Sequence, residues 1–87
     1  IEADFKKIQH RLADEYCTRG RRDKAMEALE RALIVDPYDE ESVMRIVDIR
    51  LQDGDHSSAI KTYRKYEKLL AEELGIVPSK KFPSGIL

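Results

Sequence analysis

Residues 20–37, GRRDKAMEALERALIVDP, decide the fold of this chain. The stretch begins with a glycine, which permits a tight turn. It ends with Asp36-Pro37, which stops a helix because the residue before a proline avoids the helical region. Between these ends, apolar side chains recur every three or four residues, the spacing of one helix face. They are Ala25, Met26, Leu29, Ala32 and Leu33. The sequence therefore predicts a helix over 22–35 with a turn on either side.

Three further helices follow from the same apolar spacing. The first, over about 2–19, has one apolar face, made of Phe5, Ile8, Leu12 and Tyr16. The third covers about 40–53 after Asp39, and the fourth runs from Asp55 to Gly75. Both aspartates are suitable N-cap residues, because a carboxylate there can accept from backbone amides. No segment alternates with period two for long, so no strand is predicted. The fold class is therefore all-α, with antiparallel helical hairpins because the loops are short.

The two halves of the chain align when one is shifted by 34 residues. Gly20 then aligns with Gly54, and Ala25 aligns with Ala59. Glycine permits the turn of each hairpin, and alanine lets its two helices approach closely. A helix–turn–helix period of 34 residues is typical of tetratricopeptide repeats (TPR), which this chain resembles. We therefore expect a TPR-like right-handed superhelix of two hairpins, followed by a C-terminal tail.

The repeat also sets the expected domain boundaries. A TPR-like helical domain covers 1–78, with hairpin one at about 2–35 and hairpin two at about 40–74, and residues 79–87 form the tail. Arrays of this kind usually need about three repeats for stability. We therefore expect the two hairpins to be supported by a neighbouring segment or by a second copy, which would make a homo-oligomer.

The composition is that of a small globular domain. The 87 residues are 38% charged and 41% hydrophobic, with a net charge of −1. This balance argues against a disordered tail and gives little support for direct nucleic-acid binding by this chain. A single cysteine, Cys17, excludes an internal disulfide, and no apolar run approaches the roughly 20 residues that cross a bilayer. Because the chain begins with Ile1 rather than methionine, we expect it to be a piece of a longer protein.

One cluster has residue types that can carry chemistry: His10, Asp14 and Cys17 share one helix face. A histidine and an aspartate one turn apart can both bind a metal, and a Cys–His pair can form a nucleophile. However, two turns separate the cysteine from the histidine, and the nearby aspartate opposes thiolate formation. The sequence also lacks glycine-rich phosphate loops and the common hydrolase and zinc motifs. We therefore expect no enzyme activity, no metal and no cofactor.

The same helix face is a candidate protein-binding surface. In TPR hairpins the first helix of each pair lines a concave groove, and the 34-residue shift makes three pairs of positions equivalent there. The candidate residues are His10, Arg11 and Asp14 on the first helix and Met44, Arg45 and Asp48 on the third. The two aspartates would repel the C-terminal carboxylate that some TPR domains bind. The alternative is a solvated face, or one that a neighbouring hairpin covers.

Four cations follow one face of the fourth helix, namely Lys61, Arg64, Lys65 and Lys68. Such a stripe is suited to phosphates or to an acidic partner. No aromatic side chain is interleaved with it, since Tyr63 and Tyr66 belong to the apolar face, so single-stranded nucleic acid is disfavoured. The alternative is an ordinary solvated face.

Residues 59–78, AIKTYRKYEKLLAEELGIVP, resemble the bacterial transcriptional activator domain, the TPR-like module of regulators of the Streptomyces antibiotic regulatory protein type. The most specific part is LLAEELGIVP, because Gly75 and Pro78 have no place in a general TPR consensus. With the preceding helices, the resemblance covers about 12–78. The family typically continues into a further helix, which Phe82-Pro83-Ser84-Gly85 interrupts here.

The resemblance implies a protein–protein interaction module of a cytoplasmic bacterial transcription regulator. Its partner would be another copy, RNA polymerase or a sensor domain of the same chain. It implies no direct contact with DNA by this piece and no membrane. The alternative is a generic TPR peptide-binding or scaffold domain that has no link to transcription.

Overall fold

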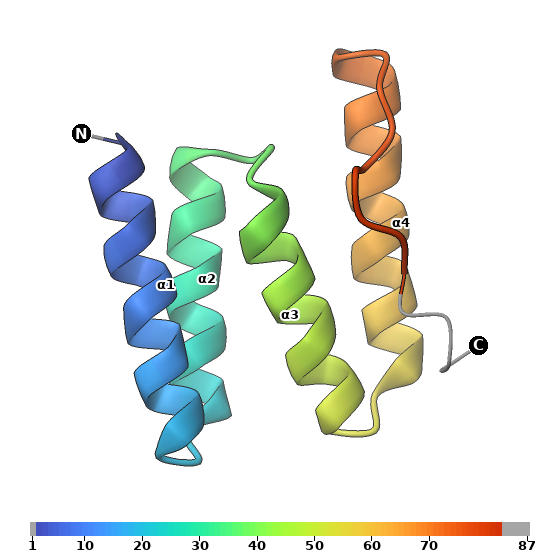
Figure 1. Ribbon diagram of the computed structural model, residues 1–87. Helices are drawn as coiled ribbons and strands as arrows, with labels where there is room; N and C mark the ends of the chain where they lie inside the picture. The colour runs from blue at the N-terminus through green and yellow to red at the C-terminus, as the bar shows by residue number, and fades with distance from the viewer. Residues whose placement is uncertain (1, 83–87) are drawn as a thin grey trace.

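The computed structural model describes residues 2–82, with side chains from Asp4 onward. Its helices are α1 (Glu2–Thr18), α2 (Arg22–Val35), α3 (Glu40–Gln52) and α4 (His56–Glu73). They lie side by side in chain order, each antiparallel to the one before it (Figure 1). The described residues contain no strand, so the all-α prediction is confirmed. The right-handed superhelix stays a prediction.

The two hairpin turns have the same construction. Gly20 and Gly54 have φ angles of +75° and +77°, which only glycine adopts without strain. In the first turn the amide of Arg21 donates to the carbonyl of Tyr16, and the equivalent hydrogen bond recurs 34 residues later. These bonds satisfy carbonyls that the end of a helix leaves unpaired. The predicted repeat is therefore also a repeat of backbone geometry.

Small residues bring the helices of each hairpin together. Ala25 and Ala59, equivalent in the repeat, are fully buried at the start of α2 and of α4. One core cluster joins α1, α2 and α3 through Ala13, Ala25, Ala28, Leu29, Ile46 and Ile49. A second joins α3 to α4 through Val43, Met44, Val47, Ala59, Tyr63, Tyr66 and Leu70. Because α3 contributes to both clusters, it connects the two hairpins.

The apolar face predicted for α1 is only partly buried. The side chains of Ile8 and Leu12 are 53% and 36% exposed, whereas the neighbouring Gln9 and Ala13 are buried. The prediction is inexact here because the face of α1 that packs against α2 is rotated by about one residue from the apolar stripe.

The predicted N-caps have different outcomes. The carboxylate of Asp55 accepts from the amide of Ser58 at 3.2 Å, as predicted. Asp39 also precedes its helix, but its side chain accepts from no backbone amide, so that part of the prediction is wrong. The carboxylate instead accepts from the Ser42 hydroxyl at 2.5 Å and contacts the ring of His10 at 3.0 Å. A contact with α1 has replaced the local cap.

The chain after α4 folds back along α3 and α4 (Figure 1). The amides of Ser79 and Lys80 both donate to the carboxylate of Glu40 at 2.9 Å. The hydroxyl of Tyr63 donates to the carbonyl of Lys80 at 2.7 Å, and the Phe82 ring packs edge-on against Tyr63. This part of the tail therefore covers α4 without forming a helix.

The rest of the tail lies outside the described residues, including most of the interruption predicted at 82–85. The division of the chain into a domain over 1–78 and a tail over 79–87 stays a prediction.

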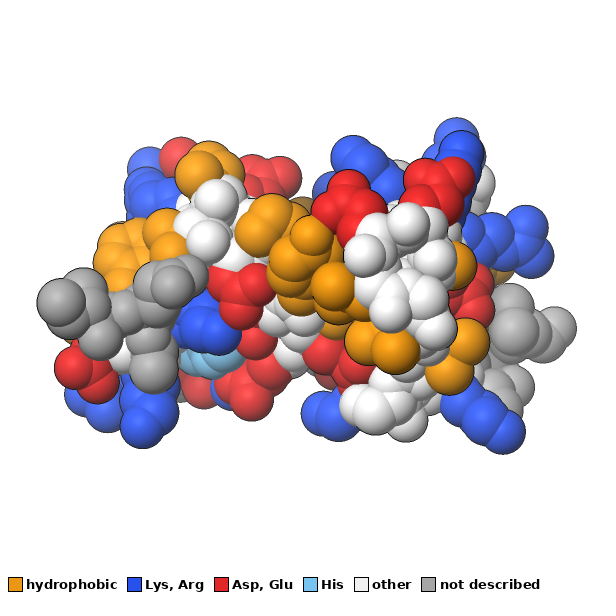
Figure 2. All heavy atoms as spheres, turned by 90° about the horizontal axis from the view of Figure 1, so that it is seen from above, with side chains coloured by type: hydrophobic (Ala, Val, Ile, Leu, Met, Phe, Trp, Pro, Cys, Tyr) orange, Lys and Arg blue, Asp and Glu red, His pale blue; other side chains and the backbone are white. Residues whose placement is uncertain are grey.

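One end of the molecule exposes apolar side chains where α2 and α4 terminate. They are Ile34, Val35, Tyr38, Leu74, Ile76 and Val77. Figure 2 looks onto this end and shows hydrophobic side chains across its middle, between charged ones. Among the described residues, no helix is long and apolar enough to cross a membrane.

Candidate functional site

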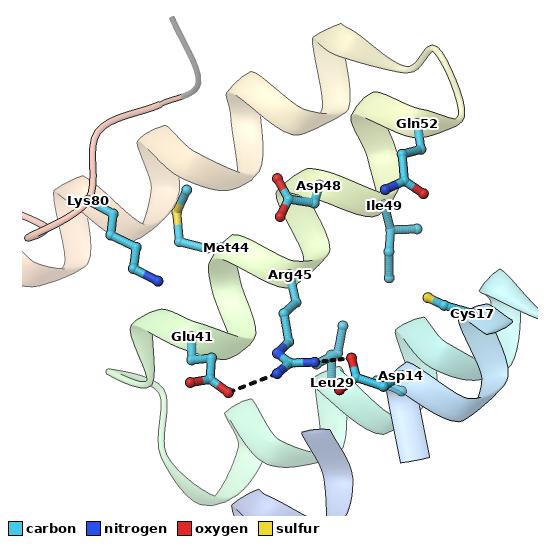
Figure 3. Close-up of a pocket in the computed structure, with 11 residues that line it drawn as sticks. Asp14, Cys17, Leu29, Glu41, Met44, Arg45, Asp48, Ile49, Gln52 and Lys80 are labelled. Atoms are coloured by element: carbon cyan, nitrogen blue, oxygen red, sulfur yellow. Dashed lines mark hydrogen bonds and ion pairs between the residues drawn. The ribbon is translucent and has the colours of Figure 1, made fainter. Parts of the chain in front are cut away.

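A cavity of about 470 Å³ lies between α1 and α3 (Figure 3). Four of the six candidate side chains line it, namely Asp14, Met44, Arg45 and Asp48. Leu29 of α2 forms part of its wall, and Lys80 reaches it from the tail. His10 and Arg11 are not among its lining residues. The structure thus brings most of the predicted site together, on two helices that are not adjacent in the chain.

His10 connects α1 to the start of α3. Its Nε2 lies 3.0 Å from the Asp39 carboxylate and 2.8 Å from the Ser42 hydroxyl, and its Nδ1 lies 2.8 Å from Glu41. The imidazole side chain is only 12% exposed. These contacts occupy both ring nitrogens, so His10 positions the two helices rather than facing the cavity.

Arg45 makes the second connection between the same helices. Its guanidinium pairs with the carboxylate of Asp14 on α1 and, at 3.1 Å, with that of Glu41 one turn earlier on α3 (Figure 3). A third contact reaches the carbonyl of His10 at 3.5 Å. The charge of Arg45 is therefore already balanced by residues of this chain.

Asp48 has a different environment from Asp14. It is exposed at the cavity edge, and among the described residues it forms no ion pair. Three carboxylates (Asp14, Glu41 and Asp48) and two cations (Arg45 and Lys80) line the cavity, an excess of one negative charge. Asp14 and Glu41 share the one positive charge of Arg45, and Asp48 is the carboxylate of the cavity that forms no ion pair among the described residues. Among the described carboxylates that line the cavity, Asp48 is therefore the one free to meet a cation from outside.

The metal and nucleophile hypotheses for His10, Asp14 and Cys17 gain no support from this geometry. Carboxylates and a hydroxyl from the α3 side occupy the histidine ring, and Asp14 pairs with Arg45. Cys17 is exposed and lines the far end of the cavity. Within the part of the chain that the structure describes, no three potential ligands are grouped to hold a metal ion.

Three carboxyl groups, Asp23, Asp36 and Glu40, have lowered pKa values, and none of them lines the cavity. A hydrogen bond from Lys6, at 2.7 Å, lowers the pKa of Asp36 and fastens α1 to the end of α2. Burial raises the pKa of Glu40, but the hydrogen bonds from Ser79 and Lys80 outweigh it and leave that pKa lowered. The carboxylates of Asp36 and Glu40 serve the packing of the elements that frame the cavity.

Comparison with known protein families indicates the kind of protein to which this cavity belongs. The family model of the bacterial transcriptional activator domain matches residues 1–84. The chain belongs to this family. The resemblance inferred over about 12–78 is confirmed, and the match extends it in both directions. No curated protein and no solved structure gives a significant match. The bacterial transcriptional activator domain is a regulatory domain, so this chain takes part in transcription control.

Sequence reasoning missed three polar contributors to the cavity of this activator domain. Glu41 was detectable, because an acid four residues before Arg45 is a common helical ion pair. Gln52 and Lys80 were not, since the first is an ordinary helix-end residue and the second arrives only because the tail folds back. The mixed charge of the cavity depends in part on that tertiary contact.

Proposed function

We propose that this activator domain is a protein–protein interaction module of a transcription regulator and that it binds a partner segment in the cavity between α1 and α3. The partner is another copy of the chain, RNA polymerase or a sensor domain of the same regulator. Bacterial regulators act where the chromosome lies, so the proposed location is the cytoplasm. The function requires no cofactor and no catalytic residue.

The observation that carries the proposal is the arrangement of Asp14, Met44, Arg45 and Asp48 around one open cavity. It combines an apolar floor with charged side chains at the rim, as protein-binding sites do. The family supports a role in transcription over the alternative of an unrelated scaffold.

The candidate residues have separate roles in this proposal. Asp48 contacts a cationic group of the partner, because it is exposed and unpaired among the described residues. Arg45 and His10 hold α1 against α3 and so shape the cavity. Arg11 is exposed on α1, one turn before the lining residue Asp14, and contributes at the margin of the site. Met44, largely buried, supplies apolar floor.

A reporter experiment tests two of these partners, RNA polymerase and another copy of the chain. The 87-residue chain is fused to an unrelated bacterial DNA-binding domain whose operator lies upstream of a reporter gene. The fusion should raise transcription above that of the DNA-binding domain alone. Sedimentation equilibrium of the isolated chain measures self-association in parallel.

Asp48→Asn should weaken whichever activity is found, because it removes the unpaired charge and leaves the fold intact. Glu67→Gln is the matched control, since Glu67 is an exposed acid on α4 away from the cavity. Arg45→Ala is less informative, because it would also break the contacts between α1 and α3. A monomeric chain that activates no transcription would exclude both of these partners and leave a sensor domain of the same regulator. Activity unchanged in Asp48→Asn would move the site elsewhere.

A further inference from the structure

A second hollow, of about 620 Å³, lies on the other face of α3. Residues two apart on a helix point about 200° apart, so Arg50 in this groove and Asp48 in the first cavity face opposite ways. The walls of the groove come from α2 and α4, and α3 forms its floor. Its lining includes Leu33, Val43, Ile46, Arg50, Lys65 and Leu69. The groove shares no lining residue with the cavity between α1 and α3.

The floor of the groove is apolar except for one guanidinium. Val43 and Ile46 are buried core residues, while Arg50 follows them one turn later on the same helix face. The Nε of Arg50 is buried and has no hydrogen-bond acceptor among the described residues. Within the same part of the chain, Arg50 forms no ion pair. A buried donor without an acceptor is unfavourable. The terminal nitrogens of Arg50 also form no hydrogen bond among the described residues, but they are not buried, so an acceptor brought by a partner can reach them.

A carboxylate is the acceptor that fits this donor. The guanidinium presents its two terminal nitrogens side by side, which matches the two oxygens of an Asp or Glu side chain. Val43 and Arg50 are seven residues apart, or about 10 Å along α3. A partner helix lying along the groove would therefore carry its carboxylate two turns from the apolar side chain that rests on Val43.

The charges on the α4 wall favour the same partner. Lys65 lines the groove and Lys61 lies one turn before it. Neither forms an ion pair within residues 4–82. Because α3 and α4 are antiparallel, Lys61 lies nearer than Lys65 to the end of the groove where Arg50 sits. Glu72 lines the groove at the opposite end, and Glu30 lines the α2 wall. Lys68 also lines the groove, so its three cations (Arg50, Lys65 and Lys68) exceed its two carboxylates by one positive charge.

We propose that the groove between α2 and α4 binds an amphipathic helix of a protein partner that carries an acidic side chain. Apolar residues of that helix pack on Leu33, Val43, Ile46 and Leu69, and one Asp or Glu pairs with Arg50. Helices bind grooves in this way through anchors spaced three, four and seven residues apart. This surface is independent of the cavity proposed above, and either site can fail without the other.

A displayed peptide library tests the proposal directly. The library consists of alanine-based helical peptides with randomised residues along one face, selected on the 87-residue chain. Enriched peptides should carry apolar anchors along one face and an Asp or Glu seven residues from the anchor that rests on Val43, before or after it according to the direction in which the peptide lies. Selection on an Arg50→Met variant should remove the acidic preference, because methionine keeps the apolar packing without the charge. Arg64→Met is the matched control, since Arg64 is an exposed α4 cation outside the groove.

Binding of one selected peptide then measures how much its acidic residue contributes to the affinity. Replacing its acidic residue with glutamine should weaken binding at least about tenfold to the original chain and less than about twofold to Arg50→Met. Amide chemical shifts should change in α2, α3 and α4 along the groove. Enrichment without an acidic residue, no enrichment at all, or shifts confined to the α1–α3 cavity would each overturn the proposal. So would a dimer of the chain that Arg50→Met dissociates, because the occupant would then be a second copy.

Discussion

Replacing Leu29 with alanine should destabilise the domain by about 2–3 kcal/mol. Leu29 is fully buried in the cluster that joins α1, α2 and α3. The change removes three carbon atoms from the core, worth about 2.4 kcal/mol at about 0.8 kcal/mol per buried methylene. A closed void would add to this loss. Because Leu29 also borders the open cavity, water and neighbouring side chains can enter the space, and the added term stays small.

Urea denaturation followed by circular dichroism measures this loss. A domain of this size has a total stability of roughly 4–13 kcal/mol, so the variant should remain folded at low temperature while its melting temperature falls by roughly 8–24 °C. Leu74→Ala is the control, because that leucine is 47% exposed after α4 and should lose less than about 0.5 kcal/mol. A loss below about 1 kcal/mol for Leu29→Ala, or one equal to that of the control, would refute the assignment of this helix face to the core.

Three further predictions concern the turn, an ion pair and a buried tyrosine. Gly54→Ala should cost about 1–2 kcal/mol in urea denaturation, because φ is +77° there and nothing crowds the added carbon. The lowered pKa of Asp36 contributes stability at neutral pH that should be lost as pH falls below about 4, and Lys6→Met should flatten that dependence in acid titrations. Tyr66→Phe should cost about 1 kcal/mol, because its hydroxyl donates to the Tyr38 carbonyl at 2.6 Å. In the unchanged chain, an absorbance titration should give Tyr66 a pKa of about 12, because burial raises the pKa of its hydroxyl.

The helices were predictable because their signals are local. These signals are the apolar spacing, Gly20, Gly54 and Asp36-Pro37, and each acts within a few residues of its own position. The helices of the structure end within one residue of the positions that these signals predict. The cap at Asp39 was not predictable in this way. Its carboxylate had a competing partner in His10, which lies 29 residues earlier in the chain. A long-range contact can therefore override a local preference where a side chain can make either one.

The sequence also predicted part of the candidate site, namely which residues share one helix face. The 34-residue shift placed Asp14, Met44, Arg45 and Asp48 on equivalent helix faces, and the structure brings them to one cavity. The shift could not separate side chains that shape the cavity from one that is open to a partner, because that depends on which carboxylate reaches Arg45. It also gave no indication of the unsatisfied guanidinium on the other face of α3.

The repeat explains why the apolar face of α1 is exposed. Ile8 and Leu12 are equivalent to Ser42 and Ile46, which are 0% and 4% exposed on α3. Ile46 is buried because α2 packs on that side of α3, whereas no described helix lies on the corresponding side of α1 (Figure 1). A periodic pattern therefore identifies a face that can pack, and the neighbouring helix decides whether it does. Since α3 has a helix on each side, it forms the common wall of the cavity and the groove, and both proposed surfaces depend on its position.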